Sequence, residues 1–91
     1  MAALFSTGQI VATPGALSAL ADAGANPVAL LDRHQMGDWG EVPAEDAAEN
    51  EYALLHGFRI MSSYRLETGT RLWVLTEADR SLTTLLLPSE Y

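Results

Sequence analysis

The chain has 91 residues, which leaves room for one domain spanning residues 1–91, because two independent cores do not fit in so short a chain. Apolar residues make up 48% of it and charged residues 19%, which is typical of a packed domain and excludes a disordered tail. The net charge of −7 argues against direct binding to nucleic acid or an anionic membrane, and the absence of cysteine excludes disulfides and thiolate chemistry.

The first part of the chain predicts one strand and two helices. Residues 8–12 are short and partly β-branched, which is typical of a strand. Thr13-Pro14 and Asn26-Pro27 each place proline after an N-cap residue, so they predict two helix starts. Gly24 and Gly37 stand where these helices should end, which predicts a helical hairpin with a short connection.

The rest of the chain predicts a third helix and a meander of three strands. Pro43 opens the helix and Gly57 ends it. Its predicted apolar stripe consists of Ala47, Ala48, Tyr52, Leu54 and Leu55. The three strands are residues 58–66, 72–77 and 82–87, with turns between them. The order β-α-α-α-β-β-β predicts an α+β fold in which three helices pack on a small antiparallel sheet.

The second strand of the meander is apolar on both faces. Leu72 and Val74 should point one way, and Trp73 and Leu75 the other. The helices can cover only one of these faces. We expect the N-terminal segment to cover the second face, and the alternatives are a protein interface or a second copy of the chain.

One candidate for chemistry combines Arg33, His34 and Asp38, next to Trp39. A histidine and a carboxylate near a turn suit acid–base catalysis, so one hypothesis is a small enzyme or ligand-binding domain centred on these residues. The simpler interpretation, which we favour, is that His34 caps the helix end and packs against Trp39.

A second candidate is an acidic stretch that holds six of the twelve acidic residues within 14 positions: Asp38, Glu41, Glu45, Asp46, Glu49 and Glu51. It lacks the spacing of a calcium loop, and a zinc site would need His34 and His56 to meet without any shared motif. We therefore expect no metal and no cofactor. The stretch is either a solvated helix face or an acidic surface that binds a basic partner.

The third candidate is the polar turn at residues 76–81. The simpler interpretation is a tight turn in which Asp79 binds local backbone amides and Arg80 pairs with Glu77. The functional interpretation is a loop presented to a partner, with Glu77, Asp79 and Arg80 as contacts. No glycine-rich phosphate loop or serine nucleophile motif is present.

Several segments together form a distinctive pattern: residues 33–35, 37–40 and 45–50, Leu72-Trp73, residues 76–81, and residues 87–91. In these segments the chain resembles a family of small uncharacterised bacterial proteins carried on plasmids, integrated elements and prophages. The resemblance extends from Gly8 to Tyr91 and implies a mobile-element setting. Small acidic proteins in that setting are often anti-restriction or anti-CRISPR inhibitors, an inference by analogy.

Together these observations predict a cytoplasmic, non-enzymatic binding protein that inhibits a host nucleic-acid-targeting defence complex. Its partner would be a host protein or nucleoprotein complex with a basic surface, with no direct contact to nucleic acid or membrane. The predicted contacts are the acidic stretch and the polar turn. Besides the enzyme hypothesis, a homodimeric regulatory component of the element remains an alternative.

Overall fold

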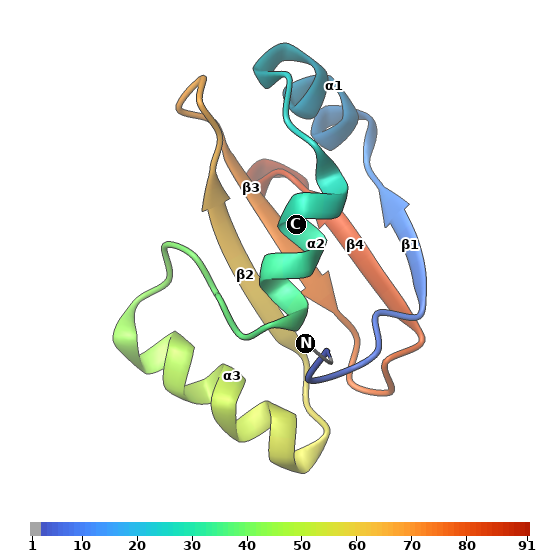
Figure 1. Cartoon of the computed structure of the whole chain (residues 1–91), viewed down its shortest axis with the longest axis vertical. Helices are drawn as coiled ribbons and strands as arrows, with labels where there is room; N and C mark the ends of the chain where they lie inside the picture. Colours follow the sequence, from blue (N-terminus) through green and yellow to red (C-terminus); the bar gives the residue numbers. More distant parts are fainter. Residues whose placement is uncertain (1–2) are drawn as a thin grey trace.

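A computed structural model describes residues 3–91 and shows a four-stranded sheet with two helices on one face and a third at one end (Figure 1). The α+β class and the predicted order of elements are confirmed. The elements are β1 (Gln9–Ala12), α1 (Pro14–Ala23), α2 (Pro27–Gln35), α3 (Ala44–His56), β2 (Ile60–Arg65), β3 (Arg71–Thr76), β4 (Leu82–Leu86) and the short 3₁₀ helix η1 (Pro88–Glu90).

The sheet has the strand order β1-β4-β3-β2. The antiparallel pairing of β2 with β3 and of β3 with β4 confirms the predicted meander. However, β1 runs parallel to β4, with Gln9 opposite Leu82, so the sheet is mixed rather than purely antiparallel. The partner of β1 lies at the other end of the chain, and local sequence patterns do not reveal the direction of such a distant pairing.

The helix starts confirm the predicted caps. The Thr13 side chain accepts a hydrogen bond from the amide of Ala16, and the Asn26 side chain accepts one from the amide of Val28. At the ends of α1 and α3, Gly24 and Gly57 adopt the left-handed conformation, which glycine reaches without steric cost.

The larger core lies between the sheet and α1 and α2. It joins residues of both helices to Tyr64, Leu72, Val74 and Leu85 of the strands. A second, smaller cluster consists of Trp39, Ala53 and Ile60, with Phe5 packed against it. This second cluster holds α3 against the end of the sheet.

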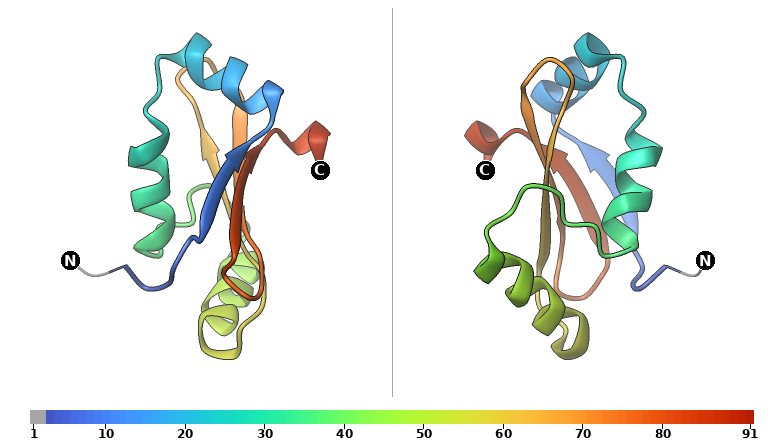
Figure 2. Two further views of the ribbon diagram at one scale, coloured as in Figure 1. Left: turned by 90° about the vertical axis from the view of Figure 1, so that its right-hand side faces the viewer. Right: turned by 60° about the vertical axis from the view of Figure 1, so that its left-hand side comes forward.

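The face of the sheet opposite α2 is covered at one end by η1, not by the N-terminal segment. Figure 2 shows the C-terminus on the side of the sheet away from α2. The Tyr91 ring packs edge-on against the partly buried Trp73, with 5.6 Å between ring centroids. The prediction that the N-terminal segment covers this face is wrong, because Phe5 packs on the helical side, against His34 and Trp39.

The helix α3 buries only part of the predicted stripe, since Ala47 and Leu54 are partly buried and pack against the second cluster. Asn50 and Ala53 are its buried residues, whereas the aromatic Tyr52 and the aliphatic Leu55 are 56% and 83% exposed. The Asn50 amide donates to the carbonyl of Met61 (2.8 Å) and accepts from its amide (3.1 Å). A polar side chain thus occupies the buried stripe because it takes the place that a further strand would have beside β2.

Candidate protein-binding surface

His34 lies in a buried hydrogen-bond chain. Its Nδ1 is 2.6 Å from Ser62 Oγ, and its Nε2 is 2.9 Å from Thr76 Oγ1. Thr76 Oγ1 in turn bonds Thr83 Oγ1 (2.7 Å), and Thr83 donates to the carbonyl of Thr7 (2.8 Å). Because the hydroxyl of Thr83 is committed to that carbonyl, Thr76 donates to Thr83 and accepts from His34. The imidazole therefore carries its proton on Nε2 and accepts from Ser62 on Nδ1.

This chain leaves His34 neutral and closed to solvent. The residue is 0% exposed, and burial, helped by the charge of Arg80, lowers the pKa of His34 to about 4. The predicted packing against Trp39 is confirmed, with ring centroids 6.1 Å apart, but the ring nitrogens bond the sheet rather than capping α2.

The other two residues of the enzyme hypothesis do not join His34. Arg33 Nε lies 2.7 Å from Asp38 Oδ2 in a pair that is about half exposed on both sides. The hydrogen bond from the Arg33 guanidinium, supported by its positive charge, lowers the pKa of the Asp38 carboxyl. The enzyme hypothesis needs Arg33, His34 and Asp38 in one shared site. The structure instead has an exposed ion pair between Arg33 and Asp38 and a separate, buried imidazole.

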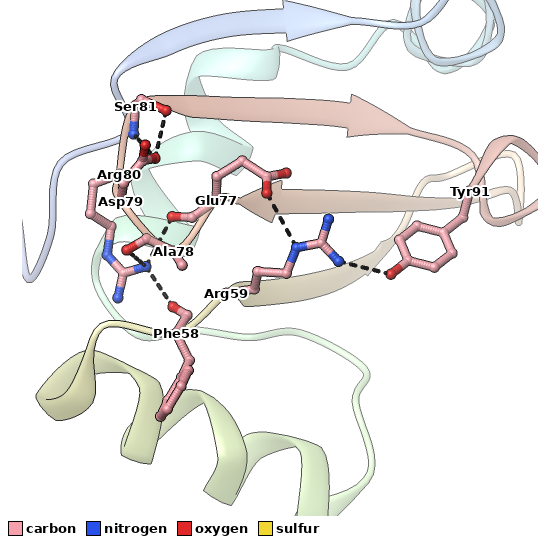
Figure 3. Close-up of polar contacts among 8 residues, drawn as sticks. All are labelled: Phe58, Arg59, Glu77, Ala78, Asp79, Arg80, Ser81 and Tyr91. Atoms are coloured by element: carbon pink, nitrogen blue, oxygen red, sulfur yellow. Dashed lines mark hydrogen bonds and ion pairs between the residues drawn. The ribbon is translucent and has the colours of Figure 1, made fainter.

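Two further carboxylates of the predicted contact set also pair with arginines. Glu41 is held by Arg65 (3.1 Å) and Arg71 (3.3 Å), and the hydrogen bond from Arg65 lowers its pKa. Glu77 pairs with Arg59 at 3.2 Å (Figure 3). These ion pairs reduce the field that Glu41 and Glu77 can offer a partner.

The polar turn is a tight structural turn. Asp79 accepts hydrogen bonds from the amide and hydroxyl of Ser81, which confirms the predicted bonding to local backbone. The predicted pairing of Arg80 with the Glu77 carboxylate is wrong, since the guanidinium instead donates to the carbonyls of Phe58 (2.6 Å), Ala53 (3.0 Å) and Glu77 (3.1 Å). Figure 3 shows Arg80 pointing toward Phe58. Arg80 thus ties the turn to the end of α3, and its backbone adopts a left-handed φ of 61°.

The acidic residues of α3 divide into two kinds. Glu51 accepts a hydrogen bond from the indole nitrogen of Trp39 at 2.9 Å. In contrast, Glu45, Asp46 and Glu49 are exposed and have no side-chain partner within residues 3–91. Of the nine residues predicted to contact a partner, these three are the carboxylates left without a bonded neighbour in the described chain.

An exposed aromatic group lies beside these carboxylates. The rings of Tyr52 and Phe58 are nearly parallel with centroids 5.9 Å apart, and His56 stacks on Tyr52 at 4.0 Å. Tyr52 and Phe58 line an open groove of about 430 Å³ that also includes Glu49 and Arg59. We call Glu45, Asp46, Glu49, Tyr52 and Phe58 together the α3 surface.

The aromatic half of this surface was not predicted, because the apolar pattern of the sequence places Tyr52 in the core. The signal that could have found it is the series Ala47, Asn50 and Ala53, spaced by three residues. Small residues at that spacing allow a helix to approach a sheet closely, which turns the neighbouring Tyr52 outward.

Within residues 3–91, no three histidine, cysteine or acidic side chains come together in a group able to hold a metal ion. None of the helices in this range is long and apolar enough to cross a membrane. Comparison with family models, with curated proteins and with solved structures found no match for this chain.

Proposed function

We propose that this chain is a non-enzymatic inhibitor carried by a mobile genetic element. It acts in the cytoplasm by binding a host nucleic-acid-targeting defence complex of the CRISPR or restriction type. The α3 surface is the contact, and a basic channel or patch of the host complex is what it occupies. The mobile-element setting comes from the resemblance of the sequence, and the mode of binding is argued from the side chains of α3.

The observation that carries the proposal is the concentration of unpaired negative charge on one helix. Glu45 and Glu49 are one helical turn apart, so they project from the same side of α3, and Asp46 follows Glu45 directly. Each arginine within residues 3–91 is bonded inside the chain, either to a carboxylate or, for Arg80, to carbonyl groups. None of these arginines forms an ion pair with Glu45, Asp46 or Glu49, although Arg59 lines the same groove as Glu49, so the three carboxylates stay available to a basic partner.

The aromatic residues of the α3 surface supply the slow dissociation that charge alone does not provide. Exposed carboxylates mainly speed association, whereas aromatic side chains that become buried slow dissociation. Tyr52 and Phe58 are 56% and 54% exposed and flank the carboxylates of α3. Their faces also attract lysine and arginine side chains, which a nucleic-acid-binding channel provides in number.

The test begins with capture of partners on the immobilised protein from lysates of bacteria that possess CRISPR and restriction systems. We expect mass spectrometry to identify a nuclease complex that salt or double-stranded DNA displaces. The decisive variant is the triple substitution Glu45→Gln, Asp46→Asn and Glu49→Gln. The control variant carries the same change of charge at three exposed acids elsewhere, Asp22→Asn, Asp32→Asn and Glu67→Gln.

Both variants reduce the net negative charge from −7 to −4, so only the position of the removed charges differs between them. At low salt we expect the α3 variant to associate with the purified complex roughly tenfold more slowly, while the control stays within about twofold of the wild type. Tyr52→Ala should instead accelerate dissociation. Equal association rates for the two triple variants would contradict the assignment of α3, and a captured partner without any role on nucleic acid would contradict the defence-inhibitor proposal.

Glu51 does not belong in the test set, although it lies in the same acidic stretch. Its carboxylate accepts from the indole of the buried Trp39, so its substitution disturbs packing as well as charge. A loss of binding in a Glu51 variant would therefore not report on the surface itself.

A further inference from the structure

The two edges of the sheet are treated differently by the rest of the chain. On the β2 edge, the backbone amide of Ser63 donates to the carbonyl of Trp39 (3.0 Å), and the backbone carbonyl of Ser63 accepts from the amide of Glu41. The Asn50 side chain bonds both backbone groups of Met61. These contacts use the outward-facing peptide groups of Met61 and Ser63 in β2. That edge is therefore closed to a further strand, as natural sheets commonly require.

The β1 edge has no comparable cover. The amides of Gln9 and Thr13 donate to the carbonyls of Ser81, just before β4, and of Leu85 in β4. By the alternation of a strand, the peptide groups of Ile10 and Ala12 therefore point away from β4. Among residues 3–91, no strand or helix lies beyond β1 on that side of the sheet (Figures 1 and 2). The side chains of Ile10 and Val11 are also exposed, at 42% and 37%.

This edge is neutral on a strongly acidic molecule. The first 21 residues of the sequence include no aspartate, glutamate, lysine, arginine or histidine, although the chain as a whole has a net charge of −7. Glu90, which reaches the end of β1, is bonded to the hydroxyl of Thr13 and the amide of Gly15. A basic partner would gain no charge attraction on such an edge, whereas two copies of this chain can meet there without opposing carboxylates.

We propose that β1 is a self-association edge, where a second copy of the chain adds its own β1 in antiparallel orientation and extends the sheet across a two-fold axis. The geometry fits one register in particular. With Val11 opposite Val11 of the second copy, Ile10 of each chain lies opposite Ala12 of the other, and each of these two pairs exchanges two hydrogen bonds. All four outward amides and carbonyls of Ile10 and Ala12 in each chain are then used.

Sedimentation velocity over a series of protein concentrations tests for the dimer. We expect a monomer–dimer equilibrium, weak because the strand has four residues. Val11→Lys places two like charges across the axis and should raise the dissociation constant roughly tenfold or more. Val28→Lys makes the same change at an exposed valine of α2 and should leave the equilibrium unchanged.

Disulfide trapping tests the register without relying on the lysine variant. The chain has no cysteine of its own, so a single introduced cysteine reports only its own contacts. At a pair without hydrogen bonds the two Cα atoms are about 4.5 Å apart, within the range that a disulfide spans. Val11→Cys should therefore form covalent dimers in a glutathione buffer, and Val28→Cys should remain monomeric.

Two results would overturn the proposal. The first is a wild-type chain that stays monomeric at concentrations approaching ~1 mM. The second is a dimer that Val11→Lys does not weaken and Val11→Cys does not trap, because its interface must then lie elsewhere. Circular dichroism of each variant shows whether the fold is retained, so that a change in association is assigned to the edge.

Discussion

As the pH falls, the protein should first lose stability through one residue, His34, and only at lower pH through the titration of its aspartates and glutamates. In the folded chain the imidazole is neutral, with a pKa of about 4 against the ordinary value of 6.5. Above pH 6.5 the imidazole is neutral in both states and the free energy of unfolding does not depend on it. Below that pH the unfolded chain binds a proton that the folded chain resists, so stability falls until the pH reaches the folded pKa.

The magnitude follows from the difference between the two pKa values. The whole difference corresponds to about 3 kcal/mol, of which about 2 kcal/mol is lost by about pH 5. Carboxyls whose pKa is lowered in the folded state, such as those of Asp38 and Glu41, also contribute, but mainly below about pH 5. The interval between about pH 5 and 6.5 therefore isolates the histidine.

Urea unfolding at a series of pH values measures this loss, and the NMR titration of the imidazole protons gives the folded pKa directly. The comparison variant is His34→Gln, whose amide offers one donor and one acceptor to Thr76 and Ser62 but does not titrate. We expect this variant to unfold with little pH dependence in that interval, whereas the wild type loses stability as the pH falls. An imidazole at position 34 that titrates near 6.5 would refute the buried neutral network.

Four further changes test the way the fold is held together. Arg80→Gly should be destabilised by about 1–3 kcal/mol in urea unfolding, although glycine relieves the left-handed backbone, because the carbonyls at the end of α3 lose their donors. Asn50→Ala should cost a similar ~1–3 kcal/mol and should increase aggregation measured by light scattering, because it exposes the β2 edge. Ser63→Ala should leave the melting temperature unchanged or raise it, since the buried Ser63 hydroxyl has no hydrogen-bond partner within residues 3–91. The phenol of Tyr64, whose pKa burial raises to about 12, should resist ionisation in an ultraviolet titration well past its ordinary value of 10.0.

The elements of this fold were predictable because their signals are local. Each N-cap and proline pair fixes a helix start within a few residues, and a glycine with positive φ ends α1 and α3. The meander was predictable for the same reason, since its turns join strands that pair with their neighbours in the sequence.

What the sequence did not reveal depends on distant contacts. The parallel pairing of β1 and the partners of His34 join segments that are far apart in the chain. The burial of Asn50 and the exposure of Tyr52 reverse what their polarity predicts, because the edge of β2 needs a hydrogen-bonding side chain more than an apolar one. The candidate surface was predicted in part for this reason: its carboxylates follow from composition, and its aromatic residues follow only from the way α3 docks.

The two proposed surfaces lie at opposite edges of the sheet, which leads to a last prediction. α3 packs beside β2, while β1 forms the other edge, so a dimer through β1 leaves both α3 helices outside the dimer interface (Figure 1). Two linked acidic surfaces bind a densely immobilised partner more tightly than one, without any new contact. Val11→Lys should therefore match the wild type against a partner free in solution, yet dissociate at least about tenfold faster from a dense partner surface. If the wild type and Val11→Lys dissociate from the dense surface at the same rate, the dimer has no part in partner binding. The proposal of an acidic contact through the α3 surface would not be affected by that result.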